Sequence, residues 1–198
     1  IGSLEKLKKQ DKGENTMNKL KVGTEVVGSV EAKRIIPVTF SVKTVWDFEC
    51  FRKDGSLKWA ELQRPNIITT QGLNSLLDVY LRNQTQIAAW YIAPVETDTV
   101  AALGMTYAVP VFTEWDGYSE GNRVAFSPAA ATGGVITNSA SKATFTAGES
   151  KTLYGAALFG GGTDPSVKND TAGGGTLFCY SKFSSSKDVE NTDTFKVT

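Results

Sequence analysis

The sequence predicts an all-β protein: a β-sandwich of the jelly-roll or immunoglobulin-like type, with one short helix covering an edge or open end. Three observations predict it. Apolar and polar residues alternate with a period of two along several short segments, and glycine-bearing turns separate those segments. Only one convincing stretch carries apolar residues at helical spacing. We assign residues 38–198 to the sandwich and residues 1–37, which are mostly polar and charged, to an extended N-terminal arm.

Two interpretations of residues 1–16 stay open. Lys12-Gly13-Glu14 precede Met17, and their codons can spell a purine-rich ribosome-binding sequence a few bases before a start codon. On that hypothesis Met17 starts the natural chain; on the other, residues 1–16 belong to an ordinary charged arm. We expect residues 17–37 to be disordered in the free protein and ordered by a partner, because they lack a core-sized apolar face.

The first predicted strand, residues 38–50, alternates almost perfectly. One side carries Val38, Phe40, Val42, Trp46, Phe48 and Cys50, and the other carries Lys43, Asp47 and Glu49. An Asp-Gly turn at residues 53–56 follows, and residues 57–62 are suited to a return strand. The pattern predicts a half-buried β-hairpin.

A helix is predicted over about residues 70–82. Pro65 disfavours helix before it, and Thr69 or Thr70 can cap the helix N-terminus. The apolar residues that follow recur at i, i+3, i+4 and i+7: Leu73, Leu76, Leu77 and Tyr80. We expect this apolar face to pack into the sandwich and close one end of it.

The rest of the chain reads as strands and turns. Strands are predicted at residues 87–95, 107–115, 134–138, 142–147, 151–159, 176–183 and 193–198, with a brief second helix at 97–105. Residues 160–175 are polar and have glycine runs at both ends, which predicts a mobile surface loop.

Charge and composition exclude several classes of function. The 21 basic and 21 acidic residues cancel, so the electrostatic footprint of a nucleic-acid-binding protein is missing. No apolar run approaches the roughly 20 residues that span a bilayer. The sequence contains no histidine, which removes Ser-His-Asp and Cys-His nucleophiles and histidine metal sites. No cofactor or metal is expected. Cys50 and Cys179 are interpreted as buried free thiols of a protein folded in a reducing cytoplasm, with a long-range disulfide as the alternative.

One acidic segment is a candidate for hydrolytic chemistry. It carries three carboxylates, Glu114, Asp116 and Glu120, with two aromatic rings nearby. A glycosidase would need one of the carboxyl groups held protonated by an apolar pocket. We expect instead a structural turn whose acids are solvated, titrate normally and do no chemistry, with Arg123 favouring their ionised forms. A calcium site is a further alternative. As a protein contact surface we single out Trp59, Trp115, Tyr118 and Arg123.

Five segments occur in an order that carries a resemblance. They are WDFECFRKDGSLKWAELQRPNIITTQGLNSLLDVYL, WYIAP, EWDGYSEGNRVAF, NSASKATFTA and LYGAALF. Together they resemble a group of small β-rich structural proteins of tailed bacteriophages. The similarity covers about residues 38–198, and the chain departs from the group in its arm and in the loop at 160–175.

The resemblance implies a non-enzymatic structural protein of the virion, assembled in the cytoplasm of the host bacterium. We expect a capsid decoration (cement) protein that binds the major capsid protein lattice and associates with itself in the particle, without nucleic acid or membrane partners. The alternatives are a tail or fibre-attachment protein and, from another class, a carbohydrate-binding module that uses the region from Trp115 to Tyr118.

Overall fold

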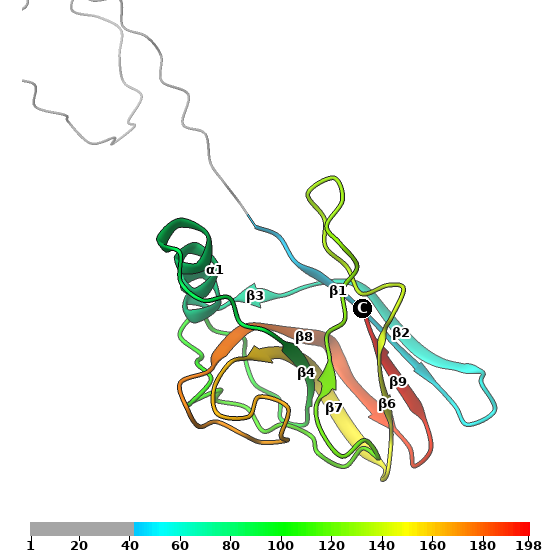
Figure 1. Cartoon of the computed structure of the whole chain (residues 1–198). Helices are drawn as coiled ribbons and strands as arrows, with labels where there is room; N and C mark the ends of the chain where they lie inside the picture. Colours follow the sequence, from blue (N-terminus) through cyan, green and yellow to red (C-terminus); the bar gives the residue numbers. More distant parts are fainter. Residues whose placement is uncertain (1–41) are drawn as a thin grey trace, which may run out of the picture. The chain divides into compact units, whose positions relative to one another are not determined.

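A computed structural model of the chain describes residues 42–198, and Figure 1 shows two antiparallel sheets packed against each other. The first sheet has the order β2-β1-β9-β6. Its strands are β1 (Val45–Phe51), β2 (Leu57–Pro65), β6 (Ala143–Thr146) and β9 (Thr194–Val197). The second has the order β3-β8-β7-β4-β5. Its strands are β3 (Ile67–Ile68), β4 (Trp90–Val95), β5 (Val124–Ala125), β7 (Lys151–Gly160) and β8 (Thr176–Val189).

The predicted all-β sandwich is therefore confirmed. The hairpin of β1 and β2 is also confirmed: the Arg52 N–H donates to Ser56 O at 2.8 Å, and Gly55 has a φ of 82° that suits glycine. The predictions for the arm at residues 1–37 lie outside the described residues.

Alternation along the strands builds the core between the sheets. In β1 the side chains of Trp46, Phe48 and Cys50 are buried, while the residues between them are not. Phe48 stacks on Phe195 of β9 with ring centroids 6.0 Å apart. The buried face of β1 was thus predicted correctly. The strand begins later than predicted, since residues 42–44 form no strand, and residues 38–41 lie outside the described residues.

The second sheet is buried on both faces. Neighbouring residues of one strand enter different clusters: Ala156 faces the first sheet, whereas Ala157 faces away from it. The outward face is covered by an irregular segment that contributes Met105, Tyr107 and Phe112. Because both faces are covered, this sheet forms the middle layer of the domain.

Three predicted elements are wrong. Residues 97–105 form no helix, and residues 107–115 form no strand, because this segment spreads its apolar side chains over the middle layer instead of pairing in a ladder. Residues 134–138 form no strand either. They belong to a protruding turn in which Gly133 and Gly134 have positive φ and Val135 donates to Thr132 O (Figure 1).

The helix α1 (Thr70–Arg82) begins as predicted but packs on an unexpected side. Thr69 is the N-cap, and its Oγ1 accepts from the Gly72 N–H at 2.9 Å. The residue that meets the sheet is Gly72, since a Cβ there would lie 2.3 Å from the carbonyl oxygen of Phe178 in β8. Of the four residues of the predicted apolar face, Leu73, Leu77 and Tyr80 are exposed, and Leu76 is half-buried. The prediction that this apolar face closes the sandwich is wrong.

A single glutamine fixes the first turn of α1. Gln71 Oε1 accepts from the backbone N–H groups of Tyr107 and Leu177, both at 2.9 Å, and its Nε2 donates to Gly175 O at 2.8 Å. The helix is thus joined to the covering segment and to β8.

We predict that Gly72→Ala loses about 1–3 kcal/mol of unfolding free energy, because the added methyl meets backbone that cannot move without disturbing β8. Gly104→Ala is the matched control: a Cβ at Gly104 meets nothing within 4 Å. Its stability should stay within about 0.5 kcal/mol of wild type. Urea unfolding measures both, and equal midpoints for the two variants would contradict close packing of the helix.

Cys50 and Cys179 are free and buried, as predicted, and both belong to the core between the sheets. Burial raises the pKa of the Cys50 thiol to about 12, with the carboxylate of Asp193 acting in the same direction. Within residues 42–198, no helix is long and apolar enough to cross a membrane.

Candidate functional site

The acidic segment lies along the end of β4. Its backbone continues the pairing of that strand, since the Trp115 N–H donates to Pro94 O at 2.8 Å and Val95 forms an isolated bridge with Glu114. Arg123 immediately precedes β5, which pairs with β4 on the same side. Two residues nine positions apart are therefore brought together at one edge of the middle layer.

Glu114 and Arg123 form a buried ion pair there. Arg123 Nη2 donates to Glu114 Oε2 at 2.7 Å, and Nε donates to both oxygens at 2.9 and 3.1 Å. Both side chains are almost fully buried. The guanidinium also lies 4.3 Å from the centroid of the Phe159 ring. Nε and Nη2 of the guanidinium thus bind the two carboxylate oxygens side by side, which is the bidentate geometry of a strong ion pair.

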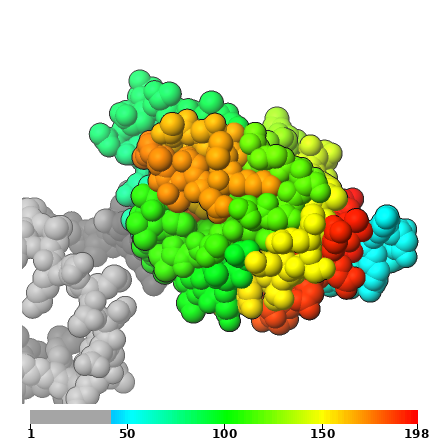
Figure 2. Space-filling model, turned by 90° about the horizontal axis from the view of Figure 1, so that it is seen from below, coloured from blue at the N-terminus to red at the C-terminus, as the bar shows by residue number. Residues whose placement is uncertain are grey.

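The ion pair holds the loop at residues 161–175. Arg123 Nη1 donates to Pro165 O at 3.1 Å, its Nη2 to Asp170 O at 3.0 Å, and its backbone N–H to Ser166 O at 2.7 Å. In return the Asn169 N–H donates to Glu114 Oε2 at 2.9 Å. The loop lies on the surface as predicted, but the expectation of a freely mobile loop does not fit these tethers (Figure 2, orange).

Further contacts join this loop to the acidic segment. Lys168 Nζ lies 3.6 Å from the centroid of the Tyr118 ring and donates to the carbonyl oxygens of Asp116 and Tyr118. Asn169 Nδ2 donates to Asp116 Oδ2 at 2.9 Å. A cation and an amide thus bind the turn that carries the acids.

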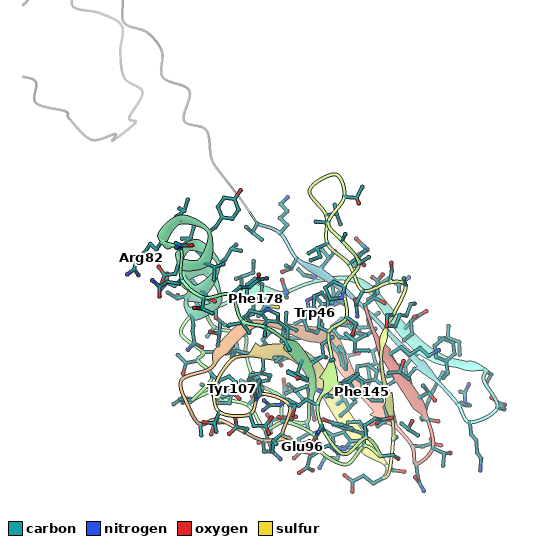
Figure 3. All side chains as sticks on the ribbon, viewed as in Figure 1. Trp46, Arg82, Glu96, Tyr107, Phe145 and Phe178 are labelled. Carbon is teal, nitrogen blue, oxygen red and sulfur yellow. The ribbon has the colours of Figure 1, made fainter. Side chains whose placement is uncertain are left out.

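Tyr107 fills the inside of the loop, and the loop's glycines allow it (Figure 3). A Cβ at Gly175 would lie 2.5 Å from the Tyr107 ring. The phenol donates to Asp170 Oδ2 at 2.6 Å. Burial, followed by the hydrogen bond to this carboxylate, raises the pKa of Tyr107 to about 12. Gly175 therefore serves close packing around an aromatic ring.

Glu120 satisfies the backbone of an edge strand. Both of its carboxylate oxygens accept from the Thr146 N–H, at 3.0 and 3.1 Å, at the end of β6. The neighbouring Ser119 N–H donates to Thr146 O at 2.8 Å. Glu120, the third carboxylate of the acidic segment, thus binds groups of the protein itself, as Glu114 and Asp116 do.

The electrostatics of Glu114 differ from the prediction. We expected solvated acids with ordinary titration, but Glu114 is buried, and desolvation raises the pKa of its carboxyl group. Arg123 and the Asn169 N–H act in the opposite direction. Burial by itself lowers the pKa of Arg123, but the bonds and charge of Glu114 raise it overall. The raised value at Glu114 reflects burial inside an ion pair and not an empty acid pocket.

The predicted contact surface is wrong for three of its four residues. Trp115, Tyr118 and Arg123 are buried and cannot meet a partner in this form of the domain. Trp115 packs edge-on against Tyr118, whose ring does the same against Phe145. Trp59 is half-buried, its Nε1 donating to Asp188 O at 2.9 Å. A contact surface must therefore be sought elsewhere.

Two further buried carboxylates escaped the sequence analysis. Glu61 accepts from the N–H and the Oγ of Ser184 and lies 3.1 Å from Lys187 Nζ. Asp193 accepts from Lys58 Nζ and from the Glu190 N–H, both at 2.8 Å. The burial of Glu61 could have been predicted from the alternation along β2, since Glu61 shares a strand face with Trp59.

Two hollows of the described surface are open and polar. One of them has a volume of about 510 Å³ and is lined by Glu96, Lys151, Tyr154, Asp188 and other residues. Its charged groups already have partners: Lys151 pairs with Glu96 at 2.7 Å, and Thr152 donates to Asp188 at 2.6 Å. Among the residues that the structure describes, no group of three or more histidine, cysteine or acidic residues is arranged to hold a metal ion.

Comparison with known proteins adds no relative: no protein-family model matches the chain, and no curated protein matches its sequence.

Proposed function

We propose that the chain is a non-enzymatic structural protein of a tailed-phage particle, which binds the shell as a decoration protein. The virion assignment rests on the order of the five sequence segments described above. The observation that carries the non-enzymatic part is the use of the acidic segment. Glu114, Asp116 and Glu120 all bind groups of the protein itself.

The burial of the rings favours this proposal over a carbohydrate-binding module. Glycan platforms present exposed aromatic rings, whereas Trp115 and Tyr118 lie in the core. The same burial removes the aromatic groove that a glycosidase would need beside its carboxylates. The free thiols fit folding in the host cytoplasm. These features favour a scaffold over a glycan-directed site.

Reconstitution tests the proposal. Shells produced without the protein are incubated with the purified 198-residue chain and sedimented, and isolated tails are treated in the same way. We expect saturable co-sedimentation with shells and none with tails. Binding to tails alone would support the tail-associated alternative, and binding to neither would contradict a virion role. A glycan array with the same protein tests the remaining alternative, for which we expect no specific signal.

A further inference from the structure

The helix α1 lies at one end of the domain (Figure 1), and it exposes an apolar stripe. Leu73 is 42 % exposed, Leu77 38 %, Tyr80 87 % and Leu81 73 %. The opposite side of the helix docks through Gly72, so the stripe points away from the sheet that holds the helix. Together the four side chains expose on the order of 400 Å² of mostly apolar surface, which is the size of patch that often has a function on a monomer.

The three leucines of the stripe are symmetric in sequence about Leu77, whereas Tyr80 at +3 has Asn74 at the corresponding −3 position. Leucines stand at positions −4, 0 and +4 relative to Leu77, and such a row is a ridge of the i±4n type. When two copies of this helix lie antiparallel around a twofold axis at Leu77, Leu77 meets its own counterpart. Leu73 of one copy then meets Leu81 of the other. A row that matches itself is what a twofold interface requires.

The charges beside the stripe do not oppose this pairing. The charged side chains of the helix are Asp78 and Arg82, which form an ion pair within it at 3.0 Å (Arg82 is labelled in Figure 3). Two copies of the helix therefore approach without net like charge. A strongly basic or acidic partner finds no complementary charge on this helix.

We infer that the exposed face of α1 is a self-association surface, and that its occupant is α1 of a second copy of this chain. Two such faces bury at most roughly 800 Å² in total, which is less than a stable specific interface buries and is in the range of weak, transient contacts. The association is therefore weak and concentration-dependent in solution. It becomes significant where copies are held side by side, because a high effective concentration offsets low affinity. The inference does not depend on the virion proposal, and the test below uses the free protein.

The test is the mass of the full chain, measured by sedimentation equilibrium between about 1 µM and 1 mM. We expect wild type to shift from monomer toward dimer across this range. Leu77→Lys and Leu77→Glu should each weaken dimerisation at least about tenfold, because the twofold axis sets like charges against each other in a desolvated contact. An equimolar mixture of the two variants should recover a heterodimer, since Lys and Glu then face each other.

Leu62→Lys is the matched control, because Leu62 of β2 is 62 % exposed and lies outside the helix. It should dimerise like wild type, and thermal melting should show that all three variants remain folded. A wild-type chain that stays monomeric at 1 mM would overturn the inference. So would equal weakening by Leu62→Lys, or a mixture of the Leu77 variants that stays monomeric.

Discussion

Arg123→Met is expected to lose about 3–5 kcal/mol of unfolding free energy, because it leaves the Glu114 carboxylate buried without its counterion. The substitution keeps an unbranched apolar stem but removes every bond from the guanidinium to Glu114, Pro165 and Asp170. Urea unfolding measures the loss. Hydrogen exchange should also become faster in residues 161–175, since the loop loses its main tether.

Two further variants separate the ion pair from packing. Arg82→Met removes an exposed arginine from its pair with Asp78 and should change stability by less than about 1 kcal/mol. The double variant Glu114→Gln/Arg123→Met should be more stable than Arg123→Met alone, because no buried charge remains unpaired. If Arg123→Met were as mild as Arg82→Met, the ion pair would not hold the loop.

Trp115→Ala is expected to lose about 3–5 kcal/mol, because it empties a large volume in the core between the sheets. The side chain is fully buried and packs against Tyr118, and its Nε1 donates to Glu149 at 3.3 Å. The expected result is a large drop in the urea midpoint with little change in the slope of the transition.

Tyr80→Ala is the control for this prediction. It removes an aromatic ring that is 87 % exposed on α1, so at low micromolar concentration it should cost less than about 0.5 kcal/mol. If Trp115 belonged to a contact surface, as the sequence suggested, the two substitutions would have similarly small effects on the isolated chain. A mild Trp115→Ala variant would therefore restore that earlier interpretation.

The sandwich was predictable because its strands alternate. Where one face of a strand meets a core, a period of two appears in the sequence, and Trp46, Phe48 and Cys50 of β1 show it. The covering segment gave no such pattern. Its apolar residues, among them Met105 and Tyr107, are spaced by the demands of packing on a sheet and not by any ladder, so propensity suggested elements that do not form.

The docking side of the helix could not be read from its apolar residues. Periodicity identified Leu73, Leu77 and Tyr80 as one face of the helix. In the structure the helix packs on β8 through the side that carries Gly72, where the backbone of β8 can approach closely. A glycine leaves no periodic signal. The sequence therefore identified the helix and its cap but not its orientation.

The geometry of the acidic segment could not be predicted from the sequence either. The segment was found from its composition, but Glu114 is buried and accepts a hydrogen bond from the N–H of Asn169, which lies 55 residues further along the chain. Proximity of that kind comes from the topology of the middle layer. A local run of acids suggests solvation, and only the fold shows that one of them enters the core.

The central claim is that the chain serves as a repeated structural component of a phage particle. The most direct measurement is its copy number in purified virions, obtained by quantitative mass spectrometry against labelled reference peptides. The account predicts a number on the order of hundreds, because a decoration protein repeats with the shell lattice. Absence of the chain from virions that carry all their other proteins would contradict it.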